Sequence, residues 1–370
     1  MDFANPALLD ALSVIPDPRK NKNILHDLKE VLVMAICAVT SGAEGFEDIE
    51  MFAKAREEWF RKFLTLKNGV PSHDTFNRVF RILDREALAE FFLEWTKSVT
   101  HLMNGEVIAV DGKVLRRSLD RGVSPLYLIN AWATENGVVL GQDRIEGSEI
   151  ESGCRLLEKL WIKGCIVTAD AASCHKDFCA AVVKQGADYV LSLKGNQERL
   201  FDAVSFFFGE VVERKTLSIP MKTFVTEEVS HGRDEKREYY MCEEIDWIDG
   251  IEEWPSLKSI GMVVSTRQSG DSFPTVEVRY YISSLAASAQ NLERAVRSHW
   301  HVENKAHWSL DVTFKEDECR VRKGNAAENL AGLRRLSLNM LKRNTDKGSV
   351  RGKVKRCGWD LNFLLKVLAG

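Results

Sequence analysis

Residues 165–193 read CIVTADAASCHKDFCAAVVKQGADYVLSL, and the order of the parts of this stretch decides the fold class. An apolar run (CIVTAD) is followed by a helical pattern that ends in glycine (KDFCAAVVKQG) and by a second apolar run (YVLSL). Upstream, the runs VIAVD, LYLINAWA and GVVLGQDRI precede a helix through RLLEKLWI. Three strands followed by alternating helices and strands predict an α/β fold, in which helices pack on the faces of a mixed sheet.

Two aspartates stand where strands are expected to end. Asp111 closes the run VIAVD and Asp170 closes the run CIVTAD. Ligands of α/β proteins collect in the crevice at the carboxyl ends of the strands, so both residues are candidates for a site. A single aspartate at such a position more often caps the following turn. Two of them at matched strand ends favour the site.

A third acid, Glu303, lies in HWHVENKAHWSLDV (299–312). Helical spacing places it in the middle of a mostly apolar stripe, made of Val296, Trp300, Glu303, His307, Leu310 and Phe314. A carboxylate in such a stripe needs a compensating partner. If Asp111, Asp170 and Glu303 converge, divalent cations are the natural partner, and oxygen ligands suit Mg²⁺, or Mn²⁺, better than zinc. A pair of such ions catalyses in-line displacement at phosphate.

Two zinc sites are alternatives. SCHKDFC holds Cys174, His175 and Cys179, although no second pair of ligands stands at zinc-site spacing. His299, Glu303 and His307 follow one another at intervals of four on one expected helical face, but the usual helical zinc motif has its glutamate next to the first histidine. These histidines could instead contact phosphate or orient Glu303 by a hydrogen bond.

The charge of the chain is segregated. The whole chain has 370 residues, 45% hydrophobic content and a net charge of −3, which fits two or three lobes and excludes a histone-like polycation. Yet Lys315 to Arg356 holds thirteen Lys or Arg against five Asp or Glu, a balance of +8, and Glu243 to Trp254 holds six acids. Four further cations follow the first aspartate: Lys113, Arg116, Arg117 and Arg121. The basic segment is either the solvated face of a helix or a surface for DNA, and its position after Glu303 favours DNA.

The cysteines and the apolar runs bear on the compartment. Eight cysteines occur without a Cys-x-x-Cys pair in a chain too large to need a disulfide framework, so we expect a reducing cytoplasm. No signal pattern opens the chain, and the run Val31 to Val39 is about half a membrane span. We therefore expect a protein without membrane segments.

The first hundred residues have helical periodicity, and the stretch after Lys194 is expected to be rich in strands and poor in helices. In GVPSHDTFNRVFRIL a turn precedes a helix capped by Ser72 or Asp74, which projects Arg78 and Arg81. Such a unit could read DNA as a helix-turn-helix, or it could serve packing alone.

Several motifs together resemble one family. VIAVDGKVLRRS, IVTADAASCHKDF, DYVLSLKGNQ, SHGRDEKRE, VRYYISS and HWHVENKAHWSLDVTFKEDECRVRKGNAAENL are similar to the H-repeat-associated, ISAs-type transposases of bacterial insertion sequences, and the resemblance covers nearly the whole chain. It implies a ribonuclease-H-like core, a β-rich insertion before the last ligand helix, an N-terminal helical leader and an Asp-Asp-Glu triad of Asp111, Asp170 and Glu303. The family's Glu-Lys-Ser-Asn-Glu-Ile run is shortened here to EGSEI.

We therefore expect the following domains: residues 1–104 as the helical leader, 105–209 and 288–345 as the two parts of the core, 210–287 as the β-rich insertion, and 346–370 as a basic tail. The resemblance also implies metal-dependent cleavage of DNA and strand transfer, with terminal inverted repeats and target DNA as partners and a homodimer on DNA as the working form. The protein would act in the bacterial cytoplasm, on the nucleoid when it is bound to DNA.

Further contacts to DNA are expected from the residues that surround the triad in the motifs, namely Lys113, Arg116, Arg117, Lys194, Asn196, Gln197, Arg233, His299, Asn304, Arg320 and Arg322. Two alternatives remain open. One is a DNA-binding remnant that no longer transposes, and the other is a nuclease with the same core that cuts without strand transfer.

Overall fold

The structure is a computed structural model that describes residues 6–20, 24–119, 124–215, 218–230, 232–270 and 272–369. The chain forms two compact units and crosses between them four times. The helical unit comprises residues 1–101, 112–145 and 303–370, and the sheet unit comprises residues 102–111 and 146–302. Strand β1 (Val107–Leu115) is divided between the units after Asp111.

The helical unit is built from helices and one hairpin. Its helices are α1 (Pro6–Leu12), α2 (Leu28–Thr40), α3 (Phe46–Ala55), α4 (Glu57–Phe60), α5 (His73–Ile82), α6 (Arg85–Val99), α11 (Trp308–Val312), α12 (Ala326–Arg343), α13 (Val350–Trp359) and α14 (Leu361–Ala369). Strands β2 (Leu126–Ala133) and β3 (Val138–Arg144) pair antiparallel. Residues 346–370, expected as a tail, thus fold largely as α13 and α14.

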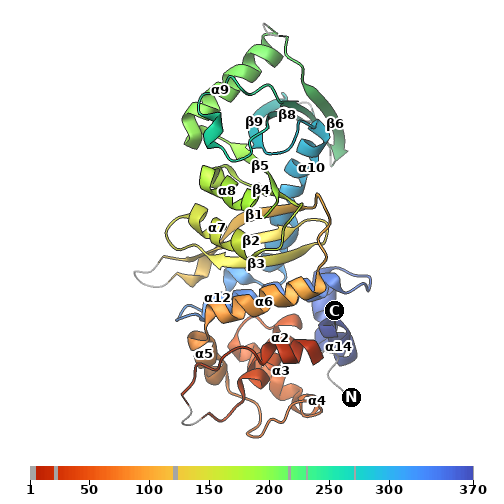
Figure 1. Ribbon diagram of the computed structural model, residues 1–370. Coiled ribbons are helices and arrows are strands. Elements are labelled where there is room, and N and C mark those ends of the chain that lie inside the picture. Colours follow the sequence, from red (N-terminus) through yellow and green to blue (C-terminus); the bar gives the residue numbers. More distant parts are fainter. Residues whose placement is uncertain are drawn as a thin grey trace. The chain divides into compact units, whose positions relative to one another are not determined.

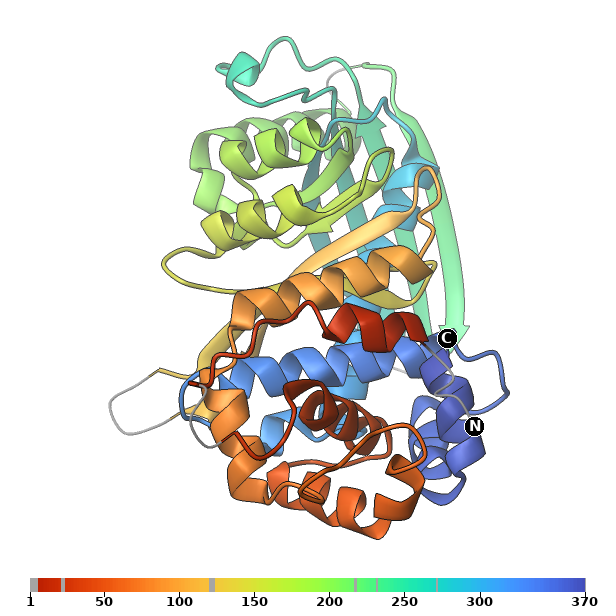
Figure 2. The same ribbon diagram turned by 60° about the horizontal axis from the view of Figure 1, so that its bottom comes forward.

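Helix α12 is the centre of the helical unit. It packs on α2, α5, α6 and β3, and Figure 2 shows it (blue) among the leader helices. Every residue from Ala326 to Leu341 is buried, including Arg334 and Arg335. Two of the basic residues that the sequence suggested for a solvated face or for DNA therefore lie in the core, where a charge needs close partners.

The sheet unit is a mixed sheet. Its strand order is β1-β4-β5-β9-β8-β7-β6, in which β1, β4 and β5 run parallel and the later strands pair antiparallel (Figure 1). The strands that follow β1 are β4 (Ile166–Ala169), β5 (Asp188–Leu193), β6 (Lys222–Ser230), β7 (Arg233–Cys242), β8 (Ser259–Ser269) and β9 (Thr275–Ser283). The helices are α7 (Glu149–Lys159), α8 (Lys176–Lys184), α9 (Glu198–Phe208) and α10 (Ala289–His299). The predicted mixed α/β architecture is confirmed, and the stretch after Lys194, predicted to be poor in helices, begins with α9.

Helix α10 packs on the middle of this sheet. Its residues Ala289, Leu292 and Ala295 join one buried cluster with side chains of β1, β4, β5, β7, β8 and β9. Gly261 of β8 allows this approach, because a Cβ atom there would lie 2.9 Å from Cδ2 of Leu292. The close packing fixes where the end of α10 stands above the sheet.

The segment around Glu303 corrects a prediction. The sequence predicted one regular helix through this residue, but α10 ends at His299, a π-helical turn covers Val302–His307, and α11 follows. A π-turn adds a residue to the turn and shifts every later side chain around the helix axis. Across 301–310 the buried residues are Val302, Ala306, Ser309 and Leu310, while Glu303 is exposed. The prediction that Glu303 lies in an inward-facing apolar stripe was therefore wrong.

Candidate active site

Asp111 and Asp170 lie side by side where the parallel ladder between β1 and β4 ends. Asp170 follows β4 directly, whereas β1 continues beyond Asp111 to Leu115, so the prediction that this strand ends at Asp111 was wrong. The last residue pairs of the parallel ladder between β1 and β4 join Ala109 to Thr168 and Val110 to Ala169, and the aspartates are the next residues on each strand. Neighbouring strands lie about 4.8 Å apart, and residues in register point to the same side of the sheet. Asp111 is half-buried and Asp170 is exposed. Two carboxylates therefore stand together at the carboxyl end of a parallel strand pair.

Asp170 also begins a turn. Its Oδ1 accepts hydrogen bonds from the backbone amides of Ala172, at 3.0 Å, and Ser173, at 3.4 Å. The capping role considered from the sequence is thus real, and both of these bonds use the same carboxylate oxygen. A cap that occupies Oδ1 fixes the direction in which the carboxylate points.

Residues that follow the end of β5 hold the same turn by hydrogen bonds. After β5, the side-chain amide of Asn196 donates to the carbonyl of Ala171 at 2.7 Å, and that of Gln197 donates to the carbonyl of Cys174 at 3.1 Å. Both residues were predicted to contact DNA. In the structure their amides hold the backbone that follows Asp170, and Lys194 just before them is exposed.

A further acid, which the sequence analysis did not select, stands beside Asp170. Glu149 lies in the first turn of α7, a helix that packs on the turn after Asp170. Burial raises the pKa of Glu149, and the negative charge of Asp170 raises it further. The residue belongs to EGSEI, where Ser148 caps α7 and the following glutamate has the form of an ordinary helix start. Only the contact between α7 and the turn after Asp170 distinguishes Glu149 from an ordinary glutamate at a helix start.

His299 contacts β4 at Thr168, two residues before Asp170. Its Nδ1 is 3.1 Å from the hydroxyl of Thr168 on β4. Burial lowers the pKa of His299, an effect that the charge of Asp170 opposes and that of Arg279 assists. We therefore expect a neutral imidazole at neutral pH, held against the sheet close to Asp170.

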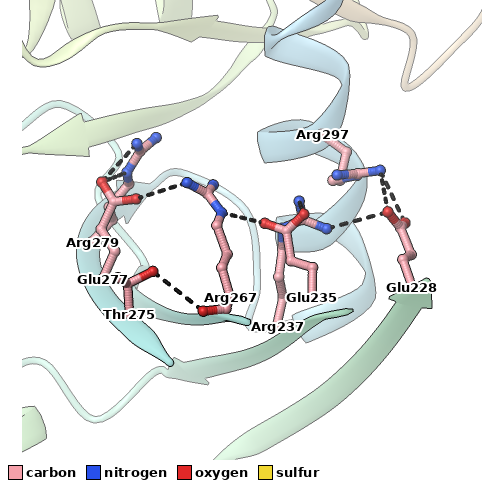
Figure 3. A network of polar contacts seen from close by, with 8 residues as sticks. All are labelled: Glu228, Glu235, Arg237, Arg267, Thr275, Glu277, Arg279 and Arg297. Atoms are coloured by element: carbon pink, nitrogen blue, oxygen red, sulfur yellow. Dashed lines mark hydrogen bonds and ion pairs between the residues drawn. The ribbon is translucent and has the colours of Figure 1, made fainter. Parts of the chain in front are cut away.

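Next to His299, the face of the sheet that α10 covers continues as a polar network (Figure 3). Arginines and glutamates alternate across the strands and onto α10. Its ion pairs join Arg279 to Glu277 at 2.7 Å, Arg267 to Glu235 at 2.6 Å, Arg237 to Glu235 at 2.5 Å and Arg297 to Glu228 at 2.9 Å. Arg279 also lies over the ring of Trp300, 5.2 Å from its centroid. The network fixes the last turn of α10.

The helical unit carries most of the other predicted residues. Lys113 is buried and pairs with Asp311 at 2.6 Å and with Asp317 at 3.6 Å, so its ammonium is engaged inside the protein. The exposed cations are Arg116, Arg117, Arg320 and Arg322. Arg116 reaches Asp317 at 3.1 Å, and Nε of Arg322 donates to the carbonyl of Arg117 at 3.0 Å.

Three predicted residues lie on exposed positions. Glu303 and Asn304 are adjacent in the π-turn, and Arg233 begins β7. Arg121, which the sequence placed near the first aspartate, lies outside the described residues. Across the described part of the chain, no three His, Cys, Asp or Glu side chains are grouped so that they could hold a metal ion.

Neither zinc alternative is supported. Cys174 and Cys179 are buried thiols, and burial raises the pKa of each, as in an apolar core. Within the described ranges they belong to no group of three possible metal ligands. His175 accepts from the amide of Asp177 as the cap of α8. His299 contacts Thr168 of β4, whereas Glu303 is exposed in the π-turn, and no metal-ligand group of three includes them among the described residues.

The fold and the site define a class of protein. It is a mixed α/β protein with paired aspartates at the carboxyl end of two parallel strands, a third acid beside them, and helices wrapped around α12. Among the described residues, no helix combines the length and the apolar character that a membrane crossing requires.

Comparisons with known proteins give the family. Residues 103–340 match the family described as "Transposase DDE domain", and residues 9–96 match the one described as "DDE_Tnp_1-associated". The chain belongs to the DDE-domain transposases, and within them to the H-repeat-associated group of bacterial insertion sequences. The resemblance inferred from the motifs is thereby confirmed, and the protein is a transposase.

Two relatives span the chain. The Escherichia coli K12 protein "H repeat-associated putative transposase YhhI" is 39% identical over 373 residues, which is 98% of this chain and 98% of the relative. The Escherichia coli O157:H7 protein "Putative transposase YncI" is 38% identical over 98% of this chain and 94% of the relative. Among solved structures, a synaptic complex of piggyBac transposase with hairpin DNA aligns with 99% of this chain and 80% of its own, at a TM-score of 0.45 and 10% identity. At this TM-score and identity, the likeness does not establish a shared fold.

Proposed function

We propose that this transposase cuts and rejoins DNA strands by divalent-metal-dependent phosphoryl transfer, with Asp111, Asp170 and Glu303 as the metal ligands. The observation that carries the proposal is the register that pairs Val110 with Ala169, because it delivers two carboxylates to one place. The role of Glu303 rests on the family motif and on its exposed side chain.

The residues present fit hard cations. The donors at the strand ends are carboxylate oxygens, which Mg²⁺ and Mn²⁺ prefer, and the negative charge of Asp170 lies close enough to Glu149 to add to the effect of burial on its pKa. A bound pair of such ions would supply activation of the attacking oxygen and stabilisation of the leaving one. The chain's own part is to aim the carboxylates, which the cap at Oδ1 of Asp170 and the amides of Asn196 and Gln197 accomplish.

Neutral His299 supports the same turn. Since its Nδ1 faces Thr168, its ring stands close to Asp170 without adding a charge of its own at neutral pH. An imidazolium there would compete with a metal ion for the carboxylate, so a lowered pKa suits this position.

The element order supports a ribonuclease-H-like core. Three strands β1 to β3 are followed by α7, β4, α8 and β5, and the antiparallel strands β6 to β9 come before α10, which leads to Glu303. In this proposal the substrates are the terminal inverted repeats of the element and a target DNA. Two element ends must be held together for transfer, which makes a homodimer on DNA the working form.

The experiment uses the purified full chain and duplex DNA that carries the inverted repeat flanking the gene. With Mg²⁺, wild type should release nicked ends and then join them to a target plasmid, whereas Asp111→Asn, Asp170→Asn and Glu303→Gln should do neither while they bind the duplex normally. Cleavage without joined product would indicate a nuclease, and binding without cleavage would indicate a remnant. Equal cleavage by wild type and the three variants would remove the proposed roles.

A further inference from the structure

We propose that Lys113 is a positioning residue for the metal site, because its ion pair with Asp311 holds the helical segment that carries Glu303 against the strand that carries Asp111. This inference rests on the proposed function, since it concerns how the third carboxylate is kept in place for catalysis. The reasons lie in where the pair stands along the chain, in its burial, and in the contacts around it.

The cationic partner of the pair lies on the strand of the first aspartate. Lys113 follows Asp111 by two residues on β1. Residues two apart in a strand point to the same side and lie about 7 Å apart along it. Because the strand is continuous, a contact that fixes Lys113 also restrains the backbone that carries Asp111. The ladder with β4 holds this backbone just before the aspartate, and the ion pair holds it just after.

The acidic partner of the pair lies on the helical segment of Glu303. The π-turn that contains Glu303 runs directly into α11, which contains Asp311. The hydroxyl of Ser309 donates to the carbonyl of Lys305 at 2.6 Å and joins the two parts of the segment. Eight residues of helix span roughly 12 Å, and so short a segment moves as one piece. A contact that fixes Asp311 therefore also restrains Glu303.

The pair is largely removed from solvent. Nζ of Lys113 lies 2.6 Å from Oδ1 of Asp311, and the two side chains are 6% and 32% exposed. Burial raises the pKa of Asp311, and the ammonium of Lys113 opposes this rise. Because desolvation offsets much of the attraction within a buried ion pair, apolar residues of similar volume would often stabilise a fold as well. The pair instead supplies a contact of fixed direction, which a metal site requires.

Further contacts join the same two stretches of chain. Asp317 lies 3.6 Å from Nζ of Lys113 and 3.1 Å from Nε of Arg116, which directly follows β1. Nε of Arg322 donates to the carbonyl of Arg117 at 3.0 Å. The stretch after Asp111 is thus joined to the stretch after Glu303 at several points. Of these contacts, the pair of Lys113 with Asp311 lies nearest to both acids along the chain.

The sequence suggested instead that Lys113 contacts DNA. To meet a phosphate, this buried ammonium would have to leave two carboxylates that lie within 3.6 Å of it. The two roles predict different effects of Asp311→Asn. If Lys113 contacted phosphate, loss of the competing carboxylate should tighten DNA binding. If the pair positions Glu303, the same change should slow cleavage and leave the Kd for DNA unchanged.

The test measures single-turnover cleavage of an end duplex by the full chain over a range of Mg²⁺ concentrations, and the Kd for the same duplex by fluorescence anisotropy in Ca²⁺. We expect Lys113→Met and Asp311→Asn each to slow cleavage of bound DNA by about tenfold or more. Each should also raise the Mg²⁺ concentration for half-maximal rate by about tenfold, with the Kd unchanged. The double variant should be no slower than the slower single variant, because both changes remove one contact.

Lys315→Met is the matched control, since Lys315 follows the same helical segment but pairs with Glu44, at 3.0 Å, and not with β1. Its cleavage rate and Mg²⁺ requirement should equal those of wild type. Lys113→Arg keeps a cation for Asp311 and should retain most of the cleavage rate. Thermal melts verify the folding of each variant. Asp311→Asn is the milder of the two single changes, because Lys113 keeps Asp317 as a partner.

A wild-type cleavage rate and Mg²⁺ requirement in both single variants would overturn the inference, as would a double variant that shows the product of the two single effects. A weaker Kd in Lys113→Met with a tighter one in Asp311→Asn would make Lys113 a DNA contact. If any of these results came while wild type cut the end and Asp111→Asn did not, the proposed function would stand without the inference. If Asp111→Asn cut as wild type does, the proposed function itself would fall.

Discussion

Arg335 and Glu316 form a bidentate ion pair that solvent does not reach. Nη1 of Arg335 lies 2.8 Å from Oε1 of Glu316, Nη2 lies 3.4 Å from Oε2, and both side chains are fully buried. Nε of the same guanidinium donates to the side-chain oxygen of Asn130 on β2 at 2.6 Å. The pair thus ties α12 to the segment after α11 and to the hairpin of the helical unit.

Removing one partner should leave the other as an uncompensated buried charge. Arg335→Met should therefore lower the free energy of unfolding by about 3–5 kcal/mol, as measured by urea denaturation. The double variant with Glu316→Gln should be less destabilised than the sum of the two single changes, because neither charge remains. Lys97→Met, which breaks the exposed pair with Glu94, should change stability little. A double variant that loses the full sum would show that the pair does not couple.

The same pair predicts a pH dependence. Burial raises the pKa of Glu316, but the charges of Arg335, Arg334 and Lys113 outweigh it, and the net pKa is lowered. The carboxylate therefore stabilises the fold above its unfolded pKa, and this stabilisation is lost as the pH falls through the folded pKa. The deficit of Glu316→Gln should be largest near neutral pH and should shrink in acid. A deficit that is constant with pH would contradict this account.

The buried pair also shows what the sequence could not reveal. A helix with Arg334 and Arg335 has the same local pattern whether its basic side is solvated or buried, and the partners of Arg335 lie at positions 130 and 316. The strands were predictable because short apolar runs with turn signals mark them locally, as in YVLSL for β5. Asp111 and Asp170 were found for the same reason, since each ends such a run.

Glu303 and Glu149 show two other limits. The inward stripe failed because a π-turn depends on how the segment packs, and helical spacing in the sequence assumes a regular helix. Glu149 was overlooked because its importance comes from the contact of α7 with the turn after Asp170, which joins residues about twenty apart. Local patterns therefore gave the elements and the strand-end acids, and tertiary contacts decided the rest.

Any side chain at Gly261 of β8 should lower the stability of the fold for steric reasons. Gly261→Ala would place its Cβ atom 2.9 Å from Leu292 and 3.5 Å from the carbonyl of Tyr240. We expect a loss of about 1–3 kcal/mol in the free energy of unfolding, because an overpacked core must shift. Gly209→Ala is the matched control, since nothing lies within 4 Å of its added Cβ atom and its φ of −58° is helical. Gly209→Ala should leave the free energy of unfolding unchanged or raise it slightly. Equal effects of the two substitutions would refute the packing argument.

A histidine in the leader should titrate above its ordinary range. The hydrogen bond to Glu50 raises the pKa of His73, and Lys54 and His73 together lower the pKa of Glu50 to about 2. Since the folded pKa of His73 is raised, its contribution to stability is present below the unfolded value and is lost as the pH rises through the folded value. NMR titration of Glu50→Gln should show the His73 pKa return toward its ordinary value. No change in that titration would mean that the 2.7 Å contact is not formed in solution.

Variants of Asn196 and Lys194 should distinguish support of the backbone beside Asp170 from direct contact with DNA. Both were predicted to contact DNA, but Asn196 donates to the backbone beside Asp170, whereas the exposed Lys194 is free of any ion pair among the described residues. We expect Asn196→Ala to slow cleavage at saturating DNA by about tenfold or more with the Kd unchanged, because a misplaced carboxylate costs rate rather than affinity. Lys194→Ala should weaken binding and reduce the salt slope by about one, with cleavage of the bound DNA unchanged. Single-turnover cleavage and anisotropy, measured on the same end duplex, distinguish the two outcomes. An Asn196→Ala variant that loses affinity and salt slope as Lys194→Ala does would make Asn196 a DNA contact and remove its role in placing Asp170.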